Sequence, residues 1–313
     1  MTRMTQITHP EHILVLQGGP GSEREVSLRS AAQVVSVLHE IGYQVTTADP
    51  ADKDFAIENA ARAYDLVVSM VHGKCGEDGV LQKRLEVIGK PFLGSGSAAC
   101  AVTFNKAHYR DFMAANGIQM APGEVVSRKG FAMSKLRQTP YILKPINGGS
   151  SVDTVIVRDL LNEPESDYFD ALFARHPQML LETLIAGQEI TVGVLGDQTL
   201  PVILIVPPAD AEFDYQNKYN GATREIVNPP QVPLAVQQQA QALALHIHRL
   251  TGCRHLSRTD MIVTPAGELC VLETNTLPGM TSESLFPKAA LAAGYAMPAL
   301  VKRFINMVLA DPA

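Results

Sequence analysis

Short apolar segments alternate with helical segments over residues 1–95, and this alternation constrains the fold more than any other feature. Residues 13–16 and 66–71 are apolar runs of strand length, while residues 25–41 carry apolar side chains at helical spacing. The same pattern predicts further strands at 43–47 and 91–93 and a helix at 80–87. Strands that alternate with helices predict a mostly parallel sheet whose site lies in the loops at the carboxyl ends of its strands.

The rest of the chain predicts two further units that mix helices with antiparallel strands, so the chain is assigned to the α/β and α+β classes. The expected boundaries are 1–95 for an N-terminal unit, 96–182 for a central unit and 183–313 for a C-terminal unit. The segments that support the later units are a helix at 106–116, strands at 141–145, 155–157, 179–182, 190–195 and 201–206, and a helix at 234–250.

Composition narrows the class of protein. The chain has 313 residues, of which 46% are hydrophobic and 19% charged, as in a globular enzyme. Its formal net charge of -6 argues against a nucleic-acid partner. Four cysteines lack the spacing of a zinc site or a disulfide framework. No apolar run approaches the ~20 residues of a membrane span, and the first ten residues do not resemble a signal peptide, so we expect a cytoplasmic protein without a membrane partner.

Three oxygen-bearing side chains near the C-terminus predict a metal site. Residues 270–273 are expected to pair with residues 261–263 in a hairpin, which places Asp260 beside Glu273. Asn275 lies two residues after Glu273 and therefore on the same face of the strand. Carboxylate and amide oxygens suit Mg²⁺ or Mn²⁺, and such Mg²⁺ normally accompanies nucleotide phosphates. Arg258 shares the face of Asp260, where a cation would stabilise a negatively charged transition state.

The alternative interpretation of this hairpin is a solvated rim with ordinary acidic residues, and each residue taken alone favours it. The segment that follows, 275–281, is an irregular loop containing Gly279. Because backbone N–H groups in such a loop can point at an anion, the whole segment favours a functional site.

A second loop predicts phosphate binding. Residues 148–151 read Gly-Gly-Ser-Ser between two expected strands, so their N–H groups, with Ser150 and Ser151, could surround a polyphosphate. The loop is not a Walker A motif, because no Gly-Lys-Ser/Thr follows it. A simple Gly-Ser turn is the common alternative, but Lys144 inside the preceding apolar strand favours an anion nearby. Lys106, at the start of a helix, is less specific.

Two loops of the N-terminal unit carry candidate substrate ligands. The segment 18–27 contains acids at 23 and 25, which would repel a pyrophosphate; Glu23 could instead bind an ammonium group or merely complement the helix dipole. His72 stands at the carboxyl end of an expected strand, where an α/β site forms, so we interpret it as functional. Glu77 and Asp78 are expected to cap the next helix.

Taken in order, these motifs resemble the D-alanine–D-alanine ligase family of the ATP-grasp superfamily. The resemblance runs from about residue 12 to residue 300 and rests on GGxxxEREVS at 18–27, HGxxGEDG at 72–79, KPxxGGSSV at 144–152, KY at 218–219, RTD at 258–260 and ExNTxPGMTxxSLxP at 273–287. Each motif is weak alone, but the ordered set is specific. It implies an ATP-grasp fold, with an N-terminal substrate-binding domain, a central lid domain and a C-terminal catalytic domain.

The resemblance implies a two-step reaction. One D-alanine carboxylate attacks the γ-phosphate of ATP, and the amine of a second D-alanine then attacks the resulting acyl phosphate. The residues implied to bind ATP are Lys106, Lys144, Lys218, Glu182, Leu184, Ile185 and Glu189. Those implied to hold two Mg²⁺ or Mn²⁺ ions are Asp260, Glu273 and Asn275.

Substrate and transition-state roles also follow from the resemblance. Glu23 would bind the first ammonium and His72 would lie beside the first carboxylate, while Ser284 and Leu285 would bind the second substrate. Arg258 and the Gly279 amide would stabilise the oxyanion. Ser150 and Tyr219 would link to Glu23 and close the loop 213–230 over the site. A homodimer working in peptidoglycan precursor synthesis is expected.

Alternatives remain open at this point. D-lactate, D-serine or another amino acid could be the second substrate, although Tyr219 favours D-alanine. A nucleotide-binding homologue without catalysis is a further alternative, against which Glu23, Arg258 and the three metal ligands argue. Departures from the family pattern are Asp153 near the expected phosphates, Asn105 before Lys106, and Cys75.

Overall fold

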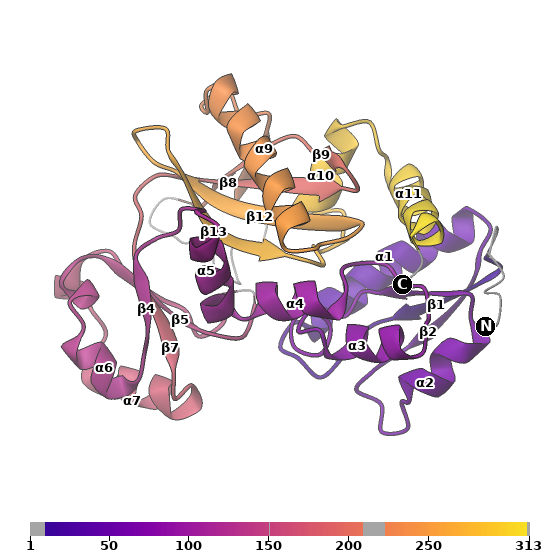
Figure 1. Ribbon diagram of the computed structural model, residues 1–313, viewed down its shortest axis with the longest axis horizontal. Coiled ribbons are helices and arrows are strands. Elements are labelled where there is room, and N and C mark those ends of the chain that lie inside the picture. Colours follow the sequence, from indigo (N-terminus) through magenta and orange to yellow (C-terminus); the bar gives the residue numbers. More distant parts are fainter. Residues whose placement is uncertain (1–9, 150, 209–222, 312–313) are drawn as a thin grey trace.

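The computed structural model describes residues 10–149, 151–208 and 223–311 (Figure 1). Within these residues the strands form three sheets, one for each part of the chain, and helices cover them. No helix in the described ranges is long and apolar enough to cross a membrane.

The N-terminal sheet is parallel, as the alternation predicts. Its order is β2-β1-β3, and β1 pairs in parallel with both neighbours. Four of the five residues of β1 are buried, which explains its continuous apolar run. The elements of this part are β1 (His12–Leu16), α1 (Arg24–Glu40), β2 (Gln44–Ala48), α2 (Ile57–Ala60), η1 (Ala61–Ala63), β3 (Leu66–Ser69) and α3 (Val80–Val87).

The strand expected at 91–93 is not present in the structure. Only Phe92 forms an isolated parallel bridge, to Val67, so the segment extends the sheet edge without becoming a strand. Gly94 follows directly with a φ of 105°, a left-handed conformation that ends extended pairing.

The central sheet is antiparallel, in the order β4-β7-β5-β6. The predicted pairing of residues 141–145 with 155–157 is confirmed by the register Tyr141↔Val157. Phe131, Phe169 and Phe173 from its two helices pack with Tyr141 into one core. The elements here are α4 (Ser97–Phe104), α5 (Lys106–Ala115), β4 (Gly123–Val126), α6 (Arg128–Met133), η2 (Leu136–Gln138), β5 (Tyr141–Pro145), β6 (Val155–Val157), η3 (Leu160–Asn162), α7 (Ser166–Arg175) and β7 (Met179–Thr183).

The C-terminal sheet follows the order β11-β10-β8-β12-β13, with β9 paired to β8. Sheet membership changes between β7 and β8, close to the expected boundary at residue 182; the three-unit division itself stays a prediction. The elements are β8 (Gln188–Leu195), β9 (Gln198–Thr199), β10 (Ile203–Val206), β11 (Arg224–Val227), α9 (Leu234–Leu250), β12 (Leu256–Val263), β13 (Leu269–Asn275), α10 (Leu285–Ala292) and α11 (Met297–Ala310).

The last helices tie the two ends of the chain together. One continuous core joins the N-terminal sheet and α1 to α10, α11 and the C-terminal sheet. In Figure 1 the yellow α11 lies beside the indigo α1, and the residues of their shared core include Val34, Val301 and Val308. This packing brings the loop after β3 against the loop after β13, where the candidate site lies.

Candidate functional site

The hairpin in which a metal site is predicted pairs Asp260 with Glu273, as expected. Asp260 on β12 pairs with Glu273 on β13, and Arg258 pairs with Asn275, so all four residues lie at one end of the ladder. The register shifts after Asp260, which lets Glu273 rather than its neighbour stand opposite Asp260. Asp260 is buried and accepts two hydrogen bonds from the Arg258 guanidinium, at 2.9 and 2.8 Å, and a third from Thr191 at 2.5 Å.

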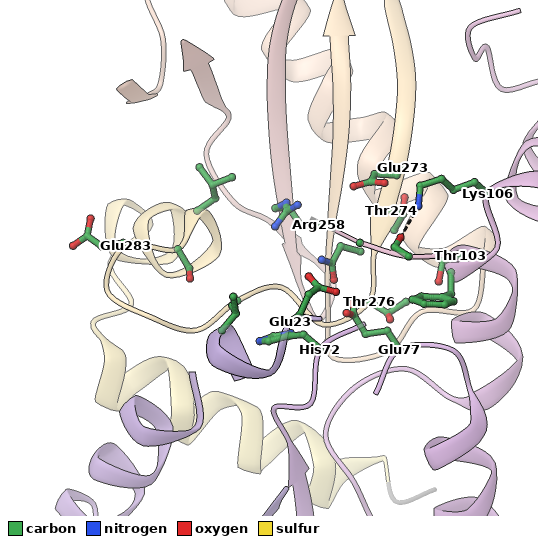
Figure 2. Close-up of a pocket in the computed structure, with 18 of the residues that line it drawn as sticks. Glu23, His72, Glu77, Thr103, Lys106, Arg258, Glu273, Thr274, Thr276 and Glu283 are labelled. Atoms are coloured by element: carbon green, nitrogen blue, oxygen red, sulfur yellow. Dashed lines mark hydrogen bonds between the residues drawn. The ribbon is translucent and has the colours of Figure 1, made fainter. Parts of the chain in front are cut away.

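A pocket opens at this end of the hairpin and is lined from all parts of the fold (Figure 2). Figure 2 shows Glu23, His72 and Glu77 below, with Arg258, Glu273 and Lys106 above them. The predicted site residues in its lining are Glu23, His72, Lys106, Arg258, Glu273, Asn275, Gly279, Ser284 and Leu285.

Glu23 lies where two glycine loops meet. A Cβ atom built on Gly73 would come within 2.4 Å of the Glu23 carboxylate, and one built on Gly149 within 2.6 Å. With a side chain at either position the Glu23 carboxylate would have to move from the place it occupies. Glu23 is the N-cap residue of α1, and its side chain makes no capping hydrogen bond.

His72 is buried, with both ring nitrogens within hydrogen-bonding distance of protein groups. Nδ1 lies 3.1 Å from the Leu277 carbonyl oxygen and Nε2 lies 3.1 Å from the Ser30 hydroxyl. Burial lowers the pKa of His72 to about 4, so the ring is neutral at physiological pH. His72 therefore contacts the loop at Leu277 through Nδ1 and helix α1 through Nε2.

Glu77 is a pocket residue that the sequence interpretation missed. It was expected to cap α3, but its carboxylate accepts a hydrogen bond from the Gly73 amide at 2.5 Å, and Asp78 alone accepts one from the first helical residue, Val80. Burial raises the pKa of the Glu77 carboxyl to about 8, and the nearby Glu23 carboxylate adds to the rise. One sequence feature could have identified Glu77 as a pocket residue, namely its position in the loop that begins with His72.

A second pocket adjoins the first. Both are lined by Lys106, Gly148, Gly149 and Glu273, so they share a border. The second pocket also contains Lys144, Ser151, Glu189 and Asp260. The Lys106 ammonium donates to the Gly148 carbonyl at 2.6 Å, which holds the predicted phosphate loop against the start of α5.

Glu182 makes contacts that the sequence did not predict. Its carboxylate is ion-paired with Lys144 at 2.6 Å and with Arg110 at 2.8 Å, and it lines neither pocket. Burial alone would lower the pKa of Lys144, but Glu182 and Glu273 reverse this and raise it. Leu184 and Ile185, which follow β7, also lie outside both linings.

The loop before α10 carries the remaining predicted residues. The Ser284 hydroxyl accepts from the Thr281 amide at 3.1 Å and lies 2.8 Å from the Thr281 hydroxyl. A Cβ atom on Gly279 would come within 2.8 Å of the Ser284 hydroxyl, so a side chain there would displace that hydroxyl. Three predicted residues, Ser150, Lys218 and Tyr219, lie outside the described residues.

Comparisons with known proteins agree on one family. Residues 112–306 match the family model described as the D-ala D-ala ligase C-terminus. The chain is 40% identical over 305 residues to a D-alanine–D-alanine ligase of Azorhizobium caulinodans, covering 96% of this chain and 99% of that relative. The chain belongs to the D-alanine–D-alanine ligase family.

Solved structures of D-alanine–D-alanine ligases resemble the structure of this chain over nearly its whole length. The ligase of Bacillus anthracis superposes with a TM-score of 0.83 at 30% identity and covers 96% of this chain and 97% of that one. The same ligase complexed with ATP gives a TM-score of 0.81 at 27% identity. The predicted ATP-grasp fold with an N-terminal parallel sheet is therefore confirmed.

Two departures from the D-alanine–D-alanine ligase pattern have local explanations. Asp153 is ion-paired with Arg175 at 2.9 Å and hydrogen-bonded to His176 at 2.7 Å, so its charge has local partners. Asn105 caps α5, since its side chain accepts from the Ala107 and His108 amides. Nothing in the structure explains the choice of cysteine at position 75, which has a φ of 76°.

The oxygen donors of Asp260, Glu273 and Asn275 are of the type that a hard divalent cation prefers. Among the described residues no group of three or more His, Cys, Asp or Glu side chains could hold a metal ion, so a site here would combine two carboxylates with the amide oxygen of Asn275. That oxygen accepts from the Leu277 amide at 2.8 Å and keeps a second lone pair. Two carboxylates and an amide, with room for water and phosphate, match the preferences of Mg²⁺ or Mn²⁺.

Proposed function

We propose that this chain catalyses the ATP-dependent ligation of two D-alanine molecules for peptidoglycan precursor synthesis. The observation that carries the proposal is the shared border of the two pockets, one acidic and one lysine-lined, at Lys106 and Glu273. A carboxylate substrate in the first pocket and a nucleotide phosphate in the second would meet at that border. Family membership over almost the whole chain supports the same conclusion.

In the first step, the carboxylate of one D-alanine attacks the γ-phosphate, giving an acyl phosphate and ADP. Glu23 is proposed to bind the ammonium of this D-alanine, and Lys106 and Lys144 to bind phosphate oxygens. Support comes from the close approach of Gly73 and Gly149 to the Glu23 carboxylate. Ser150, Ser151, Lys218, Glu182, Leu184, Ile185 and Glu189 are proposed as further ATP contacts.

In the second step, the amine of the other D-alanine attacks the acyl carbon, and phosphate leaves. Arg258 and the Gly279 amide are proposed to stabilise the oxyanion, because both line the acidic pocket. Ser284 and Leu285 are proposed to bind the second carboxylate. Tyr219 is proposed to close the loop over the site.

Two Mg²⁺ or Mn²⁺ ions are proposed to bind at Asp260, Glu273 and Asn275. When bound, such ions neutralise phosphate charge during transfer. The protein residues position the two substrates around them and exclude water from the acyl phosphate.

The proposal also specifies the second substrate, the oligomeric state and the cellular location. D-alanine is favoured over D-lactate or D-serine by the names of two curated relatives, both called D-alanine–D-alanine ligase. A homodimer in the cytoplasm fits an enzyme that uses ATP to make a cell-wall precursor, and light scattering of the purified chain tests the dimer.

Product analysis with competing acceptors tests the function. We expect ADP release from ATP to require D-alanine, and D-alanyl-D-alanine to be the main product when D-lactate and D-serine are also present. If the main product contained lactate or serine, that compound would replace D-alanine as the proposed acceptor. ADP release that is independent of every acceptor would overturn the ligase proposal.

A further inference from the structure

The hydroxyl of Ser30 links three distant parts of the chain. Ser30 lies on α1 and is fully buried. Its oxygen lies 3.1 Å from His72 Nε2 and 3.2 Å from the backbone nitrogen of Met280. These partners are 42 and 250 residues away in sequence, so the contacts are tertiary and join the N-terminal unit to the loop before α10.

The direction of each hydrogen bond follows from the chemistry of the groups. The Leu277 carbonyl oxygen can only accept, so His72 Nδ1, 3.1 Å away, must carry the proton. Neutral histidine then presents Nε2 as an acceptor, and the Ser30 hydroxyl donates to it. The same hydroxyl oxygen accepts from the Met280 N–H. One arrangement of hydrogens thus satisfies every group in the chain of contacts.

These bonds fix the loop on both sides of Gly279. Leu277 is held through its carbonyl by His72, and Met280 is held through its amide by Ser30. Gly279 lies between them and lines the acidic pocket, where its amide is proposed to meet the oxyanion. Because a donor stabilises a transition state only when its direction is preset, the two anchors determine how well this amide can act.

We propose that Ser30 is a positioning residue, which acts through His72 and Met280 to hold the Gly279 segment in its working orientation. The inference rests on the proposed ligase function. It also changes the interpretation of His72: with both ring nitrogens engaged by Leu277 and Ser30, the ring supports the loop, and its contact with substrate is through its face or edge.

The variant Ser30→Ala tests the proposal, and Ser27→Ala is its matched control. Ser27 is also fully buried on α1, but its hydroxyl donates to the Met70 carbonyl at 2.6 Å, within the N-terminal unit. We expect Ser30→Ala to lower kcat at least ~10-fold, since small displacements of a positioned group are costly, while KM for ATP stays within about 2-fold. Ser27→Ala should lose similar thermal stability and keep most of its kcat.

Backbone amide hydrogen exchange supplies a readout independent of activity. Removing the acceptor of the Met280 N–H should speed exchange in the segment 277–281 in Ser30→Ala and leave it unchanged in Ser27→Ala. Should Ser30→Ala not fold, Ser30→Cys takes its place, because the thiol is of similar size and a weaker hydrogen-bonding group.

Two outcomes separate this inference from the proposed function. If the wild-type chain makes no dipeptide, the function fails, and faster exchange in Ser30→Ala alone still supports the anchoring of the loop. If the wild-type chain is active and Ser30→Ala matches Ser27→Ala in both kcat and loop exchange, Ser30 is an ordinary packing residue and the inference is wrong.

Discussion

The Arg258 guanidinium binds the Asp260 carboxylate through two parallel hydrogen bonds, 2.9 and 2.8 Å long, two residues away on the same strand. Both side chains are largely buried, 14% and 9% exposed. A proposed oxyanion-stabilising cation and a proposed metal ligand therefore contact each other directly in this structure.

Substitution of Arg258 should separate catalysis from nucleotide binding. We expect Arg258→Ala to lower kcat by ~10²–10³, because its proposed partner charge develops only after acyl transfer begins. KM for ATP should change much less. Steady-state kinetics with ATP and D-alanine varied separately measure both, and a change confined to KM for ATP would make Arg258 a nucleotide ligand instead.

The carboxylate of Glu273 should be essential for activity and dispensable for folding. Glu273→Gln is expected to reduce ligation by about two orders of magnitude or more, since an amide cannot supply the charge needed to hold a divalent cation. The control is Glu268→Gln, on an exposed turn residue of the same hairpin. Wild-type turnover in Glu273→Gln, at matched Mg²⁺, would remove Glu273 from the metal site.

Arg110 and Arg84 each pair with a glutamate, but in different surroundings. Arg110 and Glu182 are 17% and 6% exposed, and Arg110 also donates to the Ala121 and Gly123 carbonyls. Losing one partner of a buried pair is costly, so Arg110→Met should lower the free energy of unfolding by about 3 kcal/mol.

The matched control is Arg84→Met, because Arg84 and Glu58 are 43% and 41% exposed at a similar 2.7 Å. Arg84→Met should lower the free energy of unfolding far less than Arg110→Met does, because exposed ion pairs contribute little to stability. Urea unfolding measures both variants. Because Glu182 would be left with Lys144 alone, Arg110→Met should also raise KM for ATP; equal destabilisation by the two variants would contradict this account.

Acid should destabilise the fold through buried neutral histidines. Burial lowers the pKa of His72, His248 and His255 from 6.5 to about 4. Between these values the unfolded chain binds more protons than the folded one, so the stability contribution is present above pH 6.5 and is lost as pH falls towards 4.

Urea midpoints measured across that window should fall with acidification. In His248→Gln, which changes a residue hydrogen-bonded to Ser257 outside the pocket linings, the slope should be shallower. An identical slope in this variant and the wild-type chain would show that His248 does not titrate as described.

Tyr219 lies outside the described residues, so its role is tested from the sequence prediction alone. Tyr219→Phe should leave ATP binding nearly intact, loosen loop closure and relax discrimination between D-alanine and D-lactate. Dipeptide-to-depsipeptide ratios measured across a pH range with both acceptors present report this. An unchanged ratio and rate would make the tyrosine a packing residue.

Local patterns in the sequence predicted the elements that carry the site. The apolar runs predicted the hairpin that brings Asp260 beside Glu273, whereas the one-residue register shift after Asp260, which puts these two residues directly opposite each other, was not predicted. The helix 80–87 and the helix 234–250 were predicted with the bounds that the structure has. The glycine-containing loops predicted to form the site include Gly73 and Gly149, which lie close to the Glu23 carboxylate.

Other site contacts depend on packing between distant segments, which no local pattern reports. The role inferred for Ser30 requires α1 to lie against a loop 250 residues later, and the Arg110–Glu182 pair joins α5 to β7. Glu77 was misread as a helix cap, since the sequence does not reveal that the loop turns its carboxylate back to the Gly73 amide. Helices α10 and α11 were not predicted.

The acyl phosphate is the central claim, and an isotope transfer tests it most directly. D-alanine labelled with ¹⁸O in its carboxylate is incubated with the chain, ATP and Mg²⁺, and the released phosphate is analysed by mass spectrometry. If the carboxylate attacks the γ-phosphate and phosphate later leaves from the acyl carbon, each phosphate carries one labelled oxygen and appears together with one dipeptide. Dipeptide formation with unlabelled phosphate would contradict the account.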